Sequence, residues 1–191
     1  MNEKLLATAR FYFAQSVFME NCHYKAYGRL QKKQERNKTI VIIIASLTFL
    51  TIVLQIIGLD IRSQFILTMV SYLGLILTVA SLIYEIANKE DISEIKCGHK
   101  NSAEEYKCVR DKYMCLIEEI MNDSGSYEKL SLQRNSLQEE YSRIGKYAPC
   151  TTYDDYIKAQ KSLGLSGSSN EEFTWSNDEI NLFLPVELRI K

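Results

Sequence analysis

Two long apolar runs without a charged residue constrain this chain more than any other feature. Thr39–Leu59 has 21 residues and Phe65–Tyr84 has 20, and neither contains Asp, Glu, Lys, Arg or His. A helix rises about 1.5 Å per residue, so each run is long enough to cross a hydrocarbon core about 30 Å thick. The five residues Asp60–Gln64 between them suffice only for a tight turn. The pattern predicts an all-α membrane protein with a two-helix transmembrane hairpin.

The alternative is a buried helical hairpin in a soluble protein. It is disfavoured because core helices of soluble proteins rarely keep two charge-free runs of this length. The first 38 residues are polar and charged, so we expect no signal peptide and expect both spans to stay in the protein.

Basic residues predict the orientation of the hairpin. Residues 25–38 hold six basic residues and one acid, whereas the far turn carries Arg62 balanced by Asp60. Positive charge near a span stays on the cytoplasmic side, so both termini are expected in the cytosol. The basic neck next to the first span also suits anionic lipid headgroups. It consists of Arg29, Lys32, Lys33, Arg36 and Lys38.

Residues outside the hairpin show helical periodicity. Apolar residues recur at spacings of three and four in the segments expected to be helical, 4–37, 85–122 and 127–147. Thr152 is placed to cap a short helix 153–163. Together these helices are expected to extend the hairpin as a cytosolic helical bundle. Gly98 marks a kink or break in the second of them. Ser166–Asn170 is expected to be a flexible linker.

The chain is therefore expected to have four parts. They are residues 1–38, an amphipathic helix with the basic neck; 39–88, the hairpin; 89–147, a long helix and a helical return; and 148–191, a C-terminal extension with short helices. The aromatic residues of the first part fit either a packing face or an interfacial helix. The tail 166–191 is expected either to dock on the bundle or to bind a partner.

Each predicted span carries a stripe of small and polar residues on one face. In the first span these are Thr48, Thr51, Gln55 and Gly58, and in the second they are Gln64, Thr68, Ser71, Gly74, Thr78, Ser81 and Glu85. Such stripes let membrane helices approach closely, so the two could simply meet inside the hairpin. The length of the second stripe favours another function, the lining of a pore in an oligomer. Glu85 would then ring the cytoplasmic mouth, unless it only pairs with Lys89.

The sequence carries none of the common signatures of catalysis or of cofactor binding. The sequence has no phosphate loop, no dinucleotide-binding glycines and no nucleophile elbow. Cys22-His23 and Cys97-Gly98-His99 lack the paired spacings of a zinc site. The five cysteines are expected to be reduced thiols, and the carboxylates are expected to be solvated. We expect no enzyme, no cofactor, no metal and no direct binding of nucleic acid.

The junction of the first helix and the first span reads ARFYFAQSVFMENCHYKAYGRLQKKQERNKTIVIIIASLTFLTIVLQIIG. An amphipathic helix, a basic neck, a hairpin and a long exit helix follow one another, an order that resembles the SLATT family over roughly residues 1–145. This family comprises two-transmembrane effector domains associated with bacterial nucleotide-signalling conflict systems. The resemblance implies an antiviral effector that oligomerises and forms a pore or disrupts the membrane. It also implies a nearby nucleotide second-messenger synthase, SLOG-type sensor or reverse transcriptase as system partner, and it brings no catalytic residues.

Two other functions stay open. The chain could be a membrane-anchored helical scaffold that recruits a cytosolic partner through residues 89–191. A small transporter subunit is a weaker alternative, because no charge or broken helix marks a substrate site at mid-membrane.

Overall fold

The computed structural model describes residues 3–60, 63–87, 91–165 and 174–190, and no strand occurs in these ranges. The helices are α1 (Glu3–Asp60), α2 (Gln64–Ala87), α3 (Ile92–Met121), α4 (Tyr127–Tyr147), α5 (Tyr153–Ser162), α6 (Asn177–Asn181) and the 3-10 turn η1 (Val186–Leu188). They form two compact units. Residues 30–93 are called the membrane unit here, and residues 1–29 with 94–191 are called the bundle unit. The predicted all-α class is confirmed.

Two boundaries differ from the sequence predictions. The helix expected over 85–122 is wrong as a single element, because α2 ends at Ala87 and Asp91 lies outside both α2 and α3. Aspartate competes with backbone hydrogen bonding and favours helix starts over helix interiors. The break expected at Gly98 is also wrong, since α3 passes through it. A Cβ there would lie 2.9 Å from Cγ of Pro149, so the glycine permits close packing.

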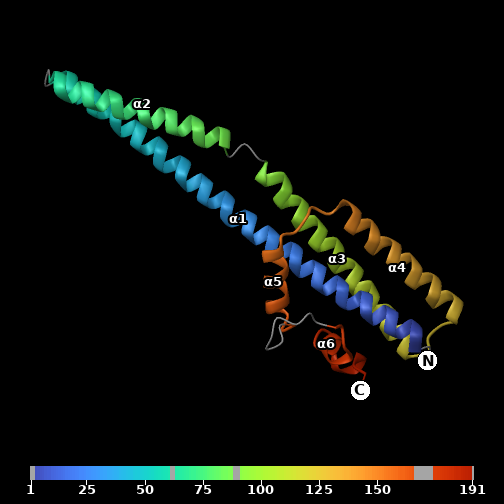
Figure 1. The fold of residues 1–191 in the computed structure, drawn as a ribbon. Helices are drawn as coiled ribbons and strands as arrows, with labels where there is room; N and C mark the ends of the chain where they lie inside the picture. The colour runs from blue at the N-terminus through green and yellow to red at the C-terminus, as the bar shows by residue number, and fades with distance from the viewer. Residues whose placement is uncertain (1–2, 61–62, 88–90, 166–173, 191) are drawn as a thin grey trace. The chain divides into compact units, whose positions relative to one another are not determined.

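The bundle unit is built around α1, α3 and α4, which run side by side in Figure 1. The periodic residues of α3 are all buried, namely Ala103, Tyr106, Val109, Tyr113, Leu116, Ile117 and Ile120. They pack on α1, where the ring of Tyr12 stacks on Tyr113 at 5.8 Å between centroids. The aromatic residues Phe13 and Phe18 of α1 are also buried. The packing interpretation of this aromatic face therefore holds over the interfacial one.

Helices α4 and α5 each begin after a capping residue, and the cap of α5 is the predicted Thr152. The Ser126 hydroxyl accepts from the backbone N–H of Lys129, and α4 then buries Leu130, Leu137 and Ile144. Thr152 opens α5 through a reciprocal capping box with Asp155.

The C-terminal tail docks on the bundle unit. Ile180 and Leu184 are buried in its core. The buried guanidinium of Arg10 donates to the Leu188 carbonyl at 3.0 Å and to Oδ1 of Asn181 at 2.8 Å. Ser176 caps α6. The linker expected at 166–170 lies outside the described residues.

In the membrane unit, α2 folds back along the last part of α1 (Figure 1). Only 6% of the most apolar 18-residue window of α1, and 0% of that of α2, is buried. A hairpin in the core of a soluble protein would bury these side chains. Their exposure is what contact with lipid requires. Two residues of the connecting turn, 61 and 62, lie outside the described ranges.

Candidate functional site in the membrane hairpin

The polar stripe of the first span lies against α2. Its four members are buried or half-buried: Thr48, Thr51, Gln55 and Gly58. Thr51 is only 4% exposed, and a Cβ added to Gly74 of α2 would lie 3.3 Å from its Oγ1. A Cβ on Gly58 would lie 3.2 Å from Cδ2 of Leu67. Both glycines therefore let the two spans approach closely, as small residues do between membrane helices.

Hydrogen bonds join the two spans at separate levels. Nε2 of Gln55 donates to Oγ of Ser71 at 3.4 Å. The hydroxyl of Tyr84 donates to Oδ1 of Asn37 at 2.9 Å, near the end of the hairpin opposite the turn. Gln55 and Ser71 lie within the apolar runs, where no water competes, so their bond helps to hold the two spans together.

The polar stripe of the second span is turned partly away from α1. Gly74 and Ser81 are half-buried, on the side of α2 that also holds the half-buried Leu67, Val70 and Leu77. The other five stripe residues are exposed, namely Gln64, Thr68, Ser71, Thr78 and Glu85. At about 100° per residue, the mean direction of the stripe is about 60° from that of the half-buried residues. Packing within the hairpin thus uses only one edge of this stripe.

Sequence reasoning missed Tyr72 in the same span. Its side chain is 64% exposed, beside a hollow of about 390 Å³ on the outer surface of α2. The hollow is lined by Leu67, Thr68, Ser71, Tyr72 and Leu75. The available signal was a tyrosine inside an apolar run, because tyrosines of membrane helices concentrate at the two interfaces.

The residues of the basic neck belong to two different units of the structure. Lys32, Arg36 and Lys38 are exposed and Lys33 is half-buried, all in the membrane unit. Arg29 belongs to the bundle unit, where its guanidinium forms an ion pair with Asp155. Its charge is therefore neutralised within the bundle unit.

A buried carboxylate holds α5 in place. Asp155 is fully buried and accepts from Nε and Nη2 of Arg29 at 3.0 and 2.8 Å. Burial acts to raise the pKa of Asp155, but the hydrogen bonds from Arg29 and Thr152 outweigh it and hold this pKa below its ordinary value. Glu20 is also buried and pairs with Arg110 at 2.7 Å. The expectation of solvated carboxylates is wrong for both acids, because each has an arginine partner distant in sequence.

Two histidines meet in the bundle unit. Nδ1 of His23 lies 3.0 Å from Nδ1 of His99, and each residue is 1% exposed. The ring of Tyr106 stacks on His23 at 5.6 Å. Burial, followed by the proximity of His99, lowers the pKa of His23 to about 4, and burial lowers the pKa of His99. Both rings are therefore neutral at pH 7, and one Nδ1–H donates to the other ring.

The neighbouring cysteines do not complete a metal site. Cys22 is buried and Cys97 is exposed. Among the described residues, no cluster of three or more His, Cys, Asp or Glu side chains is arranged to hold a metal ion.

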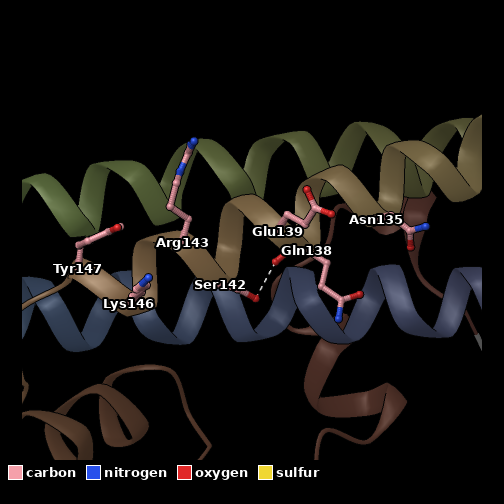
Figure 2. A pocket seen from close by; sticks show the side chains of 7 residues that line it. All are labelled: Asn135, Gln138, Glu139, Ser142, Arg143, Lys146 and Tyr147. Carbon is pink, nitrogen blue, oxygen red and sulfur yellow. Dashed lines mark hydrogen bonds between the residues drawn. The ribbon is translucent and has the colours of Figure 1, made fainter.

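The surface of α4 carries a shallow depression rather than an enclosed ligand site. Figure 2 shows its seven lining residues, all from this one helix, with the Ser142 hydroxyl donating to the Gln138 carbonyl at 2.9 Å. A site that encloses a small molecule needs walls from more than one element.

Two long paired helices with exposed apolar side chains and intrachain polar contacts define a two-span α-helical membrane protein. The sequence matches the family model described as SMODS and SLOG-associating 2TM effector domain family 4 over residues 5–179. The chain therefore belongs to this family of two-transmembrane effector domains, and the resemblance drawn from the sequence is confirmed. Comparisons with curated proteins and with solved structures gave no match.

The family match extends beyond the resemblance drawn from the sequence. That resemblance covered roughly residues 1–145, whereas the match runs through α5 and into α6. The helix anchored by Asp155 is thus part of the family domain. The matched family associates with SMODS and SLOG proteins of conflict systems, and it is described as an effector domain.

Proposed function

We propose that this protein is a bacterial inner-membrane effector of a nucleotide-signalling, antiviral conflict system, and that it makes the membrane permeable by oligomerising. The observation that carries the proposal is the exposed part of the α2 stripe. Within the chain, Gly74 lies against Thr51 and Ser71 accepts from Gln55, whereas Thr68 and Thr78 are exposed. In an assembly of several hairpins, this face would line the conducting path.

The hydroxyls of the exposed stripe are suited to such a lining. Thr68 donates to the carbonyl of Gln64, and Thr78 to that of Gly74, each at 2.9 Å. Each donor is thereby satisfied while the oxygen keeps lone pairs that can accept a hydrogen bond. A face of this kind is tolerated in lipid and also hydrates readily when other copies enclose it.

The proposed orientation places both termini in the cytosol. The exposed cations Lys32, Arg36 and Lys38 immediately precede the first apolar run, and they favour the cytoplasmic side. The bundle unit would then face the cytosol, where it can respond to a SMODS- or SLOG-type partner or, as the resemblance suggests, to a reverse transcriptase system. Glu85, exposed near the end of α2, would lie at the cytoplasmic mouth of the path.

The experiment measures membrane potential with a fluorescent dye after induced expression. The double variant Thr68→Val, Thr78→Val keeps the side-chain shapes and removes only the exposed hydroxyls. It should insert normally and lose most of the depolarisation. Gly74 is left intact because its substitution would disturb the hairpin contact with Thr51.

Ser46→Ala is the matched control, because Ser46 is exposed on the first span and lies outside both stripes. It should depolarise cells like the unmodified protein. If the double variant and the control depolarise equally, the α2 stripe does not line the path. If the unmodified protein causes no depolarisation under any trigger, the permeation function is wrong.

A membrane-anchored scaffold is the second candidate. It is favoured by two large side chains that α4 exposes, Leu132 at 69% and Tyr147 at 75%. Deleting α4 would be an unsuitable test, since Leu130 and Leu137 belong to the core. The double variant Leu132→Glu, Tyr147→Glu should instead abolish partner capture in a pull-down while leaving the potential unaffected.

A further inference from the structure

Arg10 is a buried positive charge of the bundle unit that lacks an acidic partner. Its side chain is 1% exposed, and burial lowers its pKa, yet an arginine stays protonated in a protein. Its guanidinium donates to two neutral acceptors, the Leu188 carbonyl and Oδ1 of Asn181. Its Nε is buried and has no acceptor among the described residues. A charge buried in this way is costly unless an anion joins it.

Two other arginines of the bundle unit show the usual arrangement. Arg29 is paired with Asp155 at 2.8 Å, and Arg110 is paired with Glu20 at 2.7 Å. Both of these arginine side chains also keep partial contact with solvent. Among these three guanidinium groups, the most deeply buried is therefore the one that no carboxylate of the described residues neutralises.

Arg10 lines a hollow between α1 and the C-terminal tail. The hollow has a volume of about 530 Å³, which is within the range of small-molecule sites. Phe11 and Trp175 form an aromatic wall with ring centroids 6.4 Å apart, and Phe11 is 38% exposed. The other lining residues are Glu3, Leu6, Ala7, Asn177, Ile180 and Ile190. The walls thus come from two segments distant in sequence, unlike those of the depression on α4.

The geometry points to this hollow as a binding site for a small aromatic anion, in which a flat ring is joined to a phosphate or carboxylate group. The guanidinium of Arg10 uses two of its five N–H groups within the chain, and its planar shape matches both kinds of anion. The ring of the ligand would lie against Phe11 and Trp175 and would exclude water from the ion pair. All the lining residues belong to the bundle unit, so this inference goes beyond the proposed permeation and does not depend on it.

Calorimetric titration of the full-length protein in detergent micelles tests the site with four probes. AMP and benzoate each join a ring to an anionic group. Adenosine has the ring without the charge, and inorganic phosphate has the charge without the ring. AMP or benzoate should bind with a dissociation constant below about 1 mM, and adenosine and phosphate should bind at least about tenfold more weakly. The tighter of the two aromatic anions identifies the preferred anionic group.

Arg10→Gln should weaken the binding of the tighter probe by about tenfold or more, because it removes the charge that the anion meets. This substitution also removes contacts with the tail, so two further variants leave Arg10 in place. Glu3, the one acid among the lining residues, is exposed, and Glu3→Gln should tighten binding. Asn177→Asp should weaken it, and an acid suits this first residue of α6. Each effect should be about twofold to threefold, as expected for one charge about 8 Å away through water.

Glu128→Gln is the matched control for Glu3→Gln. Glu128 is also exposed in the first turn of a helix, but it does not line the hollow, so the affinity should stay unchanged. The fluorescence of Trp175 checks that the tail stays docked in each variant.

Three results would overturn the site: no binding of AMP or benzoate, equal binding of all four probes, or full affinity in Arg10→Gln. An affinity that responds to neither Glu3→Gln nor Asn177→Asp would place the anion elsewhere and would overturn it too. Binding without depolarisation of cells would refute the permeation function and leave the site standing. Depolarisation without binding would do the reverse.

Discussion

Mild acid should destabilise the bundle unit through the buried pair His23 and His99. The pKa of His23 is about 4 in the folded protein, whereas an ordinary histidine has a pKa of about 6.5. The unfolded chain therefore takes up a proton first as the pH falls. The contribution of the neutral ring to stability is complete above pH 6.5, and it is lost progressively as the pH falls toward 4.

The loss is large enough to measure. Between pH 7 and pH 5, His23 alone should lower the free energy of unfolding by about 2 kcal/mol, since each pH unit below 6.5 costs about 1.4 kcal/mol until the folded pKa is reached. His99, whose pKa is also lowered by burial, adds in the same direction. No carboxylate is hydrogen-bonded to either ring among the described residues, and the nearby Asp155 is paired with Arg29.

Urea unfolding in detergent micelles, followed by the fluorescence of Trp175, provides the assay. This single tryptophan packs on Phe11 and Phe18 of the bundle unit. His23→Gln, which cannot titrate, is the comparison variant. Its stability should change less between pH 7 and pH 5 than that of the unmodified protein, by about 2 kcal/mol.

The variant also separates the histidine effect from that of Glu20. Burial raises the pKa of Glu20, so this acid adds stability as the pH falls, and it does so in both proteins. If the two proteins show the same pH dependence, the buried histidine pair does not titrate in the way its environment requires.

Two further pairs of substitutions, each a test and its control, probe the bundle unit by the same unfolding measurement. Arg29→Gln should lower the free energy of unfolding by about 3 kcal/mol, because it leaves the fully buried Asp155 without its ion-pair partner. Breaking a buried ion pair costs about 3–5 kcal/mol, and the lower value applies because Arg29 is one-third exposed. Lys158→Gln, which breaks only an exposed pair, should cost less than about 0.5 kcal/mol, and equal costs would refute the distinction. Leu116→Ala should cost about 3 kcal/mol through the cavity it leaves in the core, whereas Leu132→Ala at an exposed site should stay within about 0.5 kcal/mol. A similar loss for both leucines would contradict the core assigned to α3.

Structural features that depend on residues close together in the chain were predictable from the sequence. The two spans follow from charge-free length, and the buried face of α3 follows from apolar spacing. The start of α5 follows from Thr152, whose hydroxyl accepts from the backbone of Asp155. Each of these signals lies within a few residues of the structure that it determines.

Contacts between distant residues were not predictable in the same way. His23 and His99 are 76 residues apart, and Arg29 and Asp155 are 126 apart. Nothing near His23 in the sequence indicates that its ring is buried against another imidazole. Counting charges in the basic neck could not show that Arg29 forms an ion pair with Asp155 within the bundle unit.

The two polar stripes show why composition alone could not assign their roles. Both contain threonine and glycine at helical spacing, and either could have closed the hairpin. Every residue of the first stripe is buried or half-buried, with Thr51 against Gly74 and Gly58 against Leu67 of α2. The second stripe meets the first at Gly74, which lies against Thr51, and at Ser71, which accepts from Gln55, whereas Thr68 and Thr78 stay exposed.

This difference has a direct consequence for assembly. A hairpin that satisfied all its polar side chains internally would have little reason to associate, because lipid solvates its apolar surface well. Here the exposed Thr68 and Thr78 remain outside the intrachain contact. Association of hairpins through this side of α2 would shield these groups from lipid without disturbing the Thr51–Gly74 contact that keeps each hairpin closed.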